Sequence, residues 1–175
     1  MHKKLITTAA AAVALLSAAG APLRAEQVKN IVLVHGAFAD GSGWQGVADI
    51  LGKDGYAVSV VQEPLTADDV AATKRVLDLQ PGPTLLVGHS YGGVVITEAG
   101  NAPSVVGLVY IAAFIPDQGE SALGLLSQAP AANTDTRATK DDFLYIDPAA
   151  FPADFAADLA KPQANFMAHS QAMLA

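Results

Sequence analysis

The sequence contains no cysteine among its 175 residues. Disulfide bonds, thiolate metal sites and a thiol nucleophile are therefore excluded. Charged residues make up only 15% of the chain, and 17 acidic residues outnumber 10 basic ones. Because nucleic acid is bound through a basic surface, this balance argues against nucleic acid as a partner. The four histidines and the acidic residues do not have the spacing of metal ligands, so we expect no metal site.

Residues 1–25 have the layout of a secretory signal peptide. Two lysines precede an apolar, alanine-rich stretch over residues 5–16, and small residues follow up to an expected cleavage site after Ala25. The alternative is an uncleaved membrane anchor, but the apolar stretch is short for a membrane span. We therefore expect a secreted or periplasmic protein with no stable membrane span after cleavage. Cleavage would remove three basic residues and change the formal net charge from −7 to −10.

The remaining residues, 26–175, suffice for one domain with a core and are too few for two. Apolar, β-branched runs predict four buried strands, over 31–34, 57–61, 84–87 and 105–112. Helical spacing and capping residues predict helices between them, over 44–51, from Thr66 to about Leu79, and over 92–99. This alternation indicates an α/β fold, a parallel sheet with helices on both faces.

The character of the sequence changes after Asp117. Residues 118–175 contain scattered alanine, proline and aspartate, and no run that is typical of a buried strand. Short helices are expected at about 120–128, 153–160 and 162–173. We interpret this region as a helical cap or lid over the sheet and not as an independent domain.

A serine lies between two glycines where the third predicted strand meets a helix. The segment Gly88-His89-Ser90-Tyr91-Gly92 matches the pattern G-x-S-x-G. In this pattern a sharp turn holds the serine in a strained backbone conformation, and small residues two before and two after it let the strand and helix approach. We predict that Ser90 is a catalytic nucleophile, and a plain glycine-rich turn is the alternative.

The turn after the first strand, His35-Gly36-Ala37, is expected at the same edge of the sheet. Ligands of parallel sheets bind beyond the carboxyl ends of the strands. We predict that the backbone N–H groups of Ala37 and Tyr91 bind an oxyanion, helped by the N-terminus of the helix that follows Ser90. The alternative is that His35 and Gly36 only end the strand.

Three stretches carry a resemblance to a known family: VLVHGAFADGSGW (32–44), LLVGHSYGGVV (85–95) and LVYIAAFIPDQGES (108–121). Over about residues 28–175 the sequence resembles the α/β-hydrolase family, and within it the branch of small esterases, plant-type methyl esterases and hydroxynitrile lyases. The resemblance implies an α/β-hydrolase fold with a cap after Asp117 and no cofactor. It also implies a small-molecule carboxylic ester as substrate and an acyl-enzyme on Ser90.

A serine nucleophile needs a histidine as base and a carboxylate that orients it. In the α/β-hydrolase fold the chain order is serine, acid, histidine. His169 is the one histidine after Ser90, and Asp117, which follows the fourth strand, is the best acid. The alternative interpretations are a surface histidine in the cap and an aspartate that caps a loop.

Members of the family carry the acid and the histidine on loops after two further strands, and this sequence lacks those strands. We therefore expect a C-terminally truncated hydrolase, with an incomplete sheet, whose usual acid and histidine lie beyond residue 175 and whose activity is impaired. The shortened sheet would have an exposed edge, so we expect a marginally stable and aggregation-prone chain.

The same motifs fit other functions. An inactive exported remnant, or a lyase or thioesterase on the same scaffold, is an alternative to an ester hydrolase. A dinucleotide-binding protein is another, because GSGWQG (41–46) matches G-x-G-x-x-G and Glu63 lies about twenty residues on, as a ribose-binding acid would. In that fold the glycines follow the strand at once, whereas six residues separate Val34 from Gly41 here.

Overall fold

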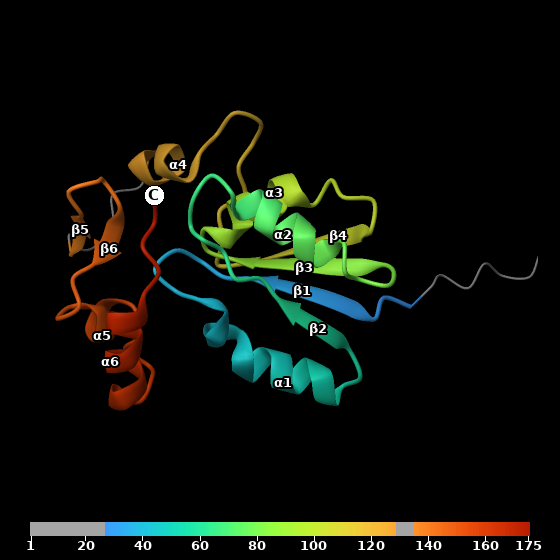
Figure 1. Cartoon of the computed structure of the whole chain (residues 1–175), viewed down its shortest axis with the longest axis horizontal. Coiled ribbons are helices and arrows are strands. Elements are labelled where there is room, and N and C mark those ends of the chain that lie inside the picture. Colours follow the sequence, from blue (N-terminus) through green and yellow to red (C-terminus); the bar gives the residue numbers. More distant parts are fainter. Residues whose placement is uncertain (1–26, 129–134) are drawn as a thin grey trace, which may run out of the picture.

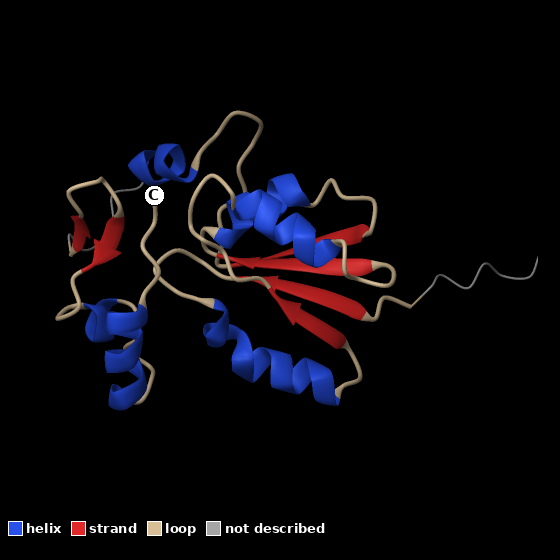
Figure 2. Ribbon diagram, in the orientation of Figure 1, coloured by secondary structure: helices blue, strands red, loops and turns tan. Residues whose placement is uncertain are grey.

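The computed structural model describes residues 27–128 and 135–175. The predicted signal peptide, residues 1–25, lies outside these described residues. Four parallel strands form the main sheet in the order β2-β1-β3-β4. They are β1 (Asn30–Val34), β2 (Ala57–Val60), β3 (Thr84–His89) and β4 (Val105–Ile111). Figures 1 and 2 show that their carboxyl ends face the C-terminal part of the chain.

Helices cover both faces of this sheet, as predicted (Figure 1). One face carries the short helix η1 (Gly41–Trp44) and α1 (Gln45–Lys53), and the other carries α2 (Asp69–Leu77) and α3 (Gly92–Ala99). Successive side chains of a strand point to opposite faces. Ile31 and Leu33 of β1 therefore pack with Trp44 on the α1 face, whereas Val32 and Val34 pack on the face of α2 and α3. Burial on both faces explains why β1 is apolar throughout.

The helix predicted from Thr66 begins at Asp69, and hydrogen bonds among residues 66–69 hold the turn that precedes it. Asp69 Oδ1 accepts the backbone N–H of Thr66 at 3.2 Å, and the Thr66 hydroxyl accepts the N–H of Asp68 at 3.2 Å. The helix then ends at Leu77, two residues before the predicted end. These bonds fix the Asp69 side chain next to the loop that follows β2.

The described residues 118–128 and 135–175, the region predicted as a cap, lie beyond the carboxyl ends of the strands (Figure 1). This region contains α4 (Ala122–Gln128), β5 (Thr136–Ala138), β6 (Leu144–Ile146), α5 (Phe151–Asp154) and α6 (Lys161–Ser170). A small core around the buried Phe151 holds the last helices together, and Phe38 from the turn after β1 packs against it. A hydrogen bond of 2.9 Å from the N–H of Ala175 to the carbonyl of Leu65 also joins the cap to the loop between β2 and α2.

Two details of the cap differ from prediction. The helix expected over 153–160 is wrong, because α5 spans Phe151–Asp154 and turns follow it. Packing outweighs helix propensity there, since Ala156 leaves the helix and enters the cap core. The antiparallel pair β5–β6 occurs where no strand was expected. Its strands have three residues each, too few to produce a periodic pattern in the sequence.

Strand β4 is an edge of the sheet, because among the described residues it pairs with β3 alone. Its apolar side chains are partly uncovered: Val109 and Ile111 expose 40% and 43% of their surface. The predicted exposed edge is thus present. Marginal stability and aggregation stay predictions.

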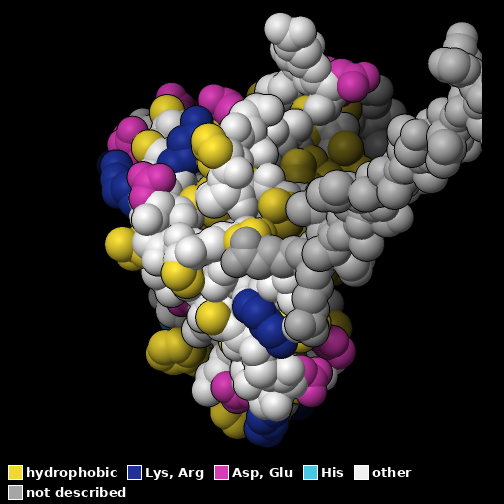
Figure 3. All heavy atoms as spheres, turned by 90° about the vertical axis from the view of Figure 1, so that its right-hand side faces the viewer, with side chains coloured by type: hydrophobic (Ala, Val, Ile, Leu, Met, Phe, Trp, Pro, Cys, Tyr) yellow, Lys and Arg dark blue, Asp and Glu magenta, His cyan; other side chains and the backbone are white. Residues whose placement is uncertain are grey.

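In the part of the chain that the structure describes, no helix has the length and apolar character to cross a membrane. Figure 3 views the molecule from the side opposite the cap. Lysine and arginine side chains are interspersed there with aspartate and glutamate. The two signs of charge are therefore mixed on this face and not separated into patches.

Candidate active site

Ser90 lies in the sharp turn that joins β3 to α3. Its φ angle is +52°, in the left-handed region that residues other than glycine rarely adopt. Two backbone hydrogen bonds hold the turn: the N–H of Ser90 donates to the carbonyl of Ile111 at 3.3 Å, and the carbonyl of Ser90 accepts the N–H of Phe114 at 3.1 Å. The predicted strained turn around Ser90 is therefore confirmed.

Gly88 and Gly92 let the strand and helix approach on either side of Ser90. A Cβ atom on Gly88 would lie 2.6 Å from the carbonyl oxygen of Gly92, and a Cβ atom on Gly92 would lie 2.6 Å from the carbonyl oxygen of His35. Carbon atoms do not approach carbonyl oxygens this closely without a shift of the backbone. The predicted need for small residues at both positions is confirmed.

Two backbone N–H groups beside Ser90 have no partner: no hydrogen bond within residues 27–128 and 135–175 uses the N–H of Ala37 or Tyr91. Tyr91 precedes the first turn of α3, where the helix dipole favours a negative charge. Ala37 follows Gly36, at which a Cβ atom would lie 3.0 Å from the Cβ of Ser90. This arrangement suits an oxyanion, and the assignment of Ala37 and Tyr91 stays a prediction.

His35 is buried and uses both ring nitrogens to hold this turn. Its Nε2 accepts the N–H of Glu63 at 3.0 Å, and its Nδ1 lies 2.9 Å from the carbonyl oxygen of Gly36. Because Nε2 is an acceptor, Nδ1 carries the proton and donates to Gly36. His35 therefore fixes the turn that carries Ala37 and is not free to act as a base for Ser90.

Two carboxyl groups are buried next to Tyr91: Glu63 and Asp69 expose only 6% and 2% of their surface. Asp69 Oδ2 accepts a hydrogen bond of 2.9 Å from the Tyr91 hydroxyl. Neither carboxyl oxygen of Glu63 has a hydrogen-bond partner of normal geometry among the described residues, and the same is true of Thr73 Oγ1. The residue after Ser90 is thus tied to a buried acidic pair.

Burial raises the pKa of Glu63 from 4.5 to about 8, and the negative charge of Asp69 adds to the rise, while the neighbouring Thr73 hydroxyl offsets part of it. Burial also raises the pKa of Tyr91, together with its hydrogen bond to Asp69 and the charges of both acids. Glu63 is therefore uncharged at neutral pH. The sequence did not predict this pair. Its pattern favoured a ribose-binding acid at Glu63 and a helix-capping residue at Asp69.

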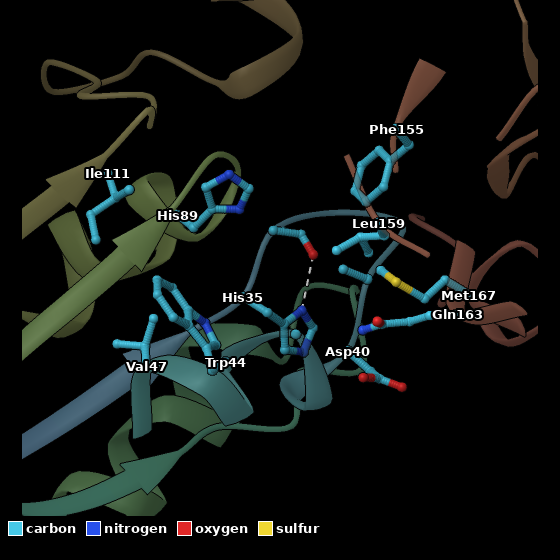
Figure 4. Close-up of a pocket in the computed structure, with 13 residues that line it drawn as sticks. His35, Asp40, Trp44, Val47, His89, Ile111, Phe155, Leu159, Gln163 and Met167 are labelled. Atoms are coloured by element: carbon cyan, nitrogen blue, oxygen red, sulfur yellow. Dashed lines mark hydrogen bonds between the residues drawn. The ribbon is translucent and has the colours of Figure 1, made fainter. Parts of the chain in front are cut away.

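A pocket of about 300 Å³ opens between the carboxyl ends of the strands and the cap (Figure 4). Its sheet side includes His35, Gly36, Trp44, Val47, His89 and Ile111. Its cap side is formed by Phe155, Leu159, Gln163 and Met167. The mostly apolar lining, with a few polar groups, is typical of a site for a small molecule. The cap side of this pocket could not be recognised from the sequence.

His89 points into the pocket and meets the ring of Trp44 edge-on, with ring centroids 6.3 Å apart (Figure 4). Burial lowers the pKa of His89, so its imidazole is neutral at neutral pH. No hydrogen bond joins His89 to Ser90 within the described ranges. His89 therefore contributes a neutral polar group to the pocket wall.

The predicted acid and base lie apart from this pocket. Asp117 is exposed in a turn that Glu120 closes: the Glu120 carboxylate accepts the Asp117 N–H at 2.8 Å. His169 is exposed near the end of α6 and makes no hydrogen bond to any described residue. It lies two residues after the pocket-lining Met167, so a rotation of about 100° per residue directs it away from the pocket. The assignments of Asp117 and His169 stay predictions.

The remaining sequence motifs have structural explanations. Among the described residues, no group of three or more His, Asp and Glu side chains could hold a metal ion. Gly41 of the stretch 41–46 packs against Gln62: its N–H donates to Gln62 Oε1 at 3.1 Å, and a Cβ atom would lie 2.5 Å from Gln62 Nε2. Glu63 is buried and does not present a carboxylate to a ligand. These contacts disfavour the dinucleotide alternative.

Comparison with curated proteins finds a relative of greater length. The chain is similar to a carbendazim hydrolyzing esterase from Nocardioides sp. (strain SG-4G), with 36% identity over 116 residues. The match covers 57% of this chain and 48% of the esterase. The chain thus spans about half the length of the curated relative that it matches.

Solved structures share the fold. A variant of tomato methylketone synthase I complexed with β-ketoheptanoate matches with a TM-score of 0.70 and 16% identity, over 85% of this chain and 68% of that one. A variant of polyneuridine aldehyde esterase matches with a TM-score of 0.69 and 18% identity, over 85% of this chain and 70% of that one. At these identities the likeness concerns the fold alone.

The family model described as "Alpha/beta hydrolase family" matches residues 31–175. That range contains the sheet apart from Asn30 of β1, the turn around Ser90 and the region predicted as a cap. Together with the parallel sheet and the strained serine turn, this match shows that the chain belongs to the alpha/beta hydrolase family.

Proposed function

We propose that this chain provides the nucleophile and the oxyanion site of a serine hydrolase that cleaves small-molecule carboxylic esters. The observation that carries the proposal is the backbone around Ser90, which is strained at φ +52° and lies beside two unused N–H groups. The name of the 36% identical relative, an esterase, supports an ester as the substrate class. The apolar pocket, whose lining includes Gly36 and His89 beside Ser90 but not Ser90 itself, would hold the acyl or the alcohol group.

The proposed reaction has two steps. Ser90 Oγ loses its proton to a base and attacks the acyl carbonyl carbon, while the N–H groups of Ala37 and Tyr91 bind the oxyanion. The alcohol leaves with a proton as the carbonyl re-forms. Water then attacks the acyl-enzyme, which releases the carboxylic acid and restores the Ser90 hydroxyl.

We further propose that neither Asp117 nor His169 completes this machinery, so that hydrolysis by this chain is impaired. Both side chains are exposed and lie apart from the pocket. The other described histidines are engaged elsewhere: His35 holds the turn before Ala37, and His89 packs on Trp44.

The test is incubation of the whole chain with p-nitrophenyl acetate, followed by mass spectrometry of the peptide that contains Ser90. We expect a single acetyl group on Ser90, no such label in Ser90→Ala, and the same label in His169→Ala as in the wild-type chain. If the wild-type chain and Ser90→Ala are acetylated to the same extent, and at residues other than Ser90, the proposal is overturned. Steady turnover that is lost in both variants would show that His169 is the base after all.

We also propose that the chain is exported, because residues 1–25 have the layout of a secretory signal peptide. When the full chain is produced in a bacterium, we expect a shorter form that begins at Glu26 in the periplasm or the medium. Cell fractionation followed by N-terminal sequencing checks this. Recovery of an uncleaved chain from the cytoplasm would contradict it.

A further inference from the structure

Glu63 is the least expected buried group in the described structure. Only 6% of the surface of Glu63 is exposed, and both of its buried carboxyl oxygens lack a hydrogen-bond partner of normal geometry. A charged carboxylate in such a place would lose its hydration without compensation. The carboxyl is therefore neutral in the folded protein. Because burial of a polar group without a hydrogen-bond partner lowers the stability of the fold, we look for a physical role of this group.

Its neighbour Asp69 has the opposite environment. Both Asp69 oxygens accept hydrogen bonds, one from the Tyr91 hydroxyl at 2.9 Å and one from the Thr66 N–H at 3.2 Å. Asp69 is also the first residue of α2, where the helix dipole favours a negative charge. Of the two acids, Asp69 thus has a hydrogen-bond donor for each oxygen, whereas Glu63 has none of normal geometry.

The pair faces the residue that follows the nucleophile. Tyr91 reaches Asp69 with its hydroxyl, and its backbone N–H is one of the two unused donors beside Ser90. The titratable side chains that face Glu63 are Asp69 from α2, Tyr91 from the turn before α3, and His35 from the end of β1, whose ring accepts the Glu63 N–H. Changes at Glu63 can therefore reach the oxyanion site through one side chain.

We propose that Glu63 is a positioning residue for the candidate oxyanion site: its uncharged carboxyl keeps Asp69 bound to the Tyr91 hydroxyl, and loss of its proton displaces Tyr91 and the N–H beside Ser90. The effect of Glu63 on catalysis rests on the proposed serine hydrolase function. The coupling between the protonation of Glu63 and the position of Tyr91 is independent of that function.

Electrostatics gives the direction of the effect. No salt bridge within the described residues involves Glu63 or Asp69, since the ones present join Arg137 to Asp135 and Asp147. A second negative charge beside Asp69 would thus be buried without a cation, and the two carboxylates would repel. Repulsion weakens the contact between Asp69 and Tyr91, and the raised pKa of Glu63, about 8, places this change just above neutral pH.

The test is an NMR titration of the whole chain from pH 6 to 10, which follows the side-chain carboxyl carbon of Glu63 and the backbone amide of Tyr91. We expect the two signals to change with one common midpoint near pH 8. In Glu63→Gln, which stays neutral at every pH, the change at the Tyr91 amide should be lost. In the control Glu98→Gln, at an exposed position of α3, it should persist.

Two further measurements separate the possible failures. In Tyr91→Phe, Glu63 should still titrate while the amide of residue 91 no longer follows it, because the link through the hydroxyl is gone. A Tyr91 amide that stays flat across the Glu63 midpoint in the wild-type chain overturns the proposal without any variant. The rate at which a reactive phosphonate labels Ser90 should decline around pH 8 in the wild-type chain relative to Glu63→Gln. If no labelling occurs at any pH in any variant, the hydrolase function fails and the NMR result still decides the positioning role.

Discussion

Replacement of Gly88 by alanine is expected to lower the free energy of unfolding by about 3 kcal/mol. The new Cβ would lie 2.6 Å and 2.8 Å from the carbonyl oxygen and carbon of Gly92. These are backbone atoms, so no rotation of a side chain relieves the clash, and the strand and the helix around Ser90 have to separate. Urea unfolding of both proteins, followed by far-UV circular dichroism, measures the difference.

Gly46→Ala is the matched control for this prediction. A Cβ at Gly46 meets nothing within 4 Å, and the residue lies in helix α1. Alanine favours a helix over glycine, so this variant should be neutral or more stable by up to about 1 kcal/mol. If Gly88→Ala unfolds at the same urea concentration as Gly46→Ala, the close approach of β3 and α3 described here is wrong.

Glu63→Gln is expected to be more stable than the wild-type chain at pH 9 and of similar stability at pH 4. The pKa of Glu63 is raised in the folded protein from 4.5 to about 8, so the folded state binds this proton more tightly than the unfolded state does. Its contribution to stability is therefore fully present below pH 4.5 and is lost as the pH rises through about 8. Glutamine stays neutral, and its advantage at pH 9 should be on the order of a few kcal/mol.

Chemical denaturation of both proteins at several pH values between 4 and 9 checks this prediction. Only the difference between the wild-type chain and Glu63→Gln isolates Glu63, because many other groups titrate in this range. Glu98→Gln, at an exposed position, should show no such pH-dependent difference. A constant difference between Glu63→Gln and the wild-type chain at all pH values would mean that Glu63 is ionised in the folded state or is not buried.

The turn around Ser90 could be predicted from sequence because every requirement is local. An apolar strand, a serine and two glycines at fixed spacing within residues 84–92 define its backbone. The sheet could be predicted for a similar reason, since each strand is a short apolar run with a helix after it. Even the exposed edge at β4 followed from the number of such runs.

The acidic pair could not be predicted, because it depends on tertiary contacts. Asp69 and Tyr91 are 22 residues apart and meet only when α2 packs on the face of the sheet that carries α3. Before that packing is known, Glu63 is one acidic residue in a loop after a strand. The same reason explains the cap: the pocket residue Phe155 follows α5 and Met167 lies in α6, and a core rather than periodicity sets the positions of both.

Phe38 belongs to two parts of the molecule at once. Its backbone, with φ +63°, continues the turn that carries Ala37, while its side chain packs against the core of the cap. Phe38 therefore links the cap to the turn that carries Ala37. A displacement of the cap would therefore also displace the residue next to Ala37, so the packing of the cap bears on the position of the Ala37 N–H beside Ser90.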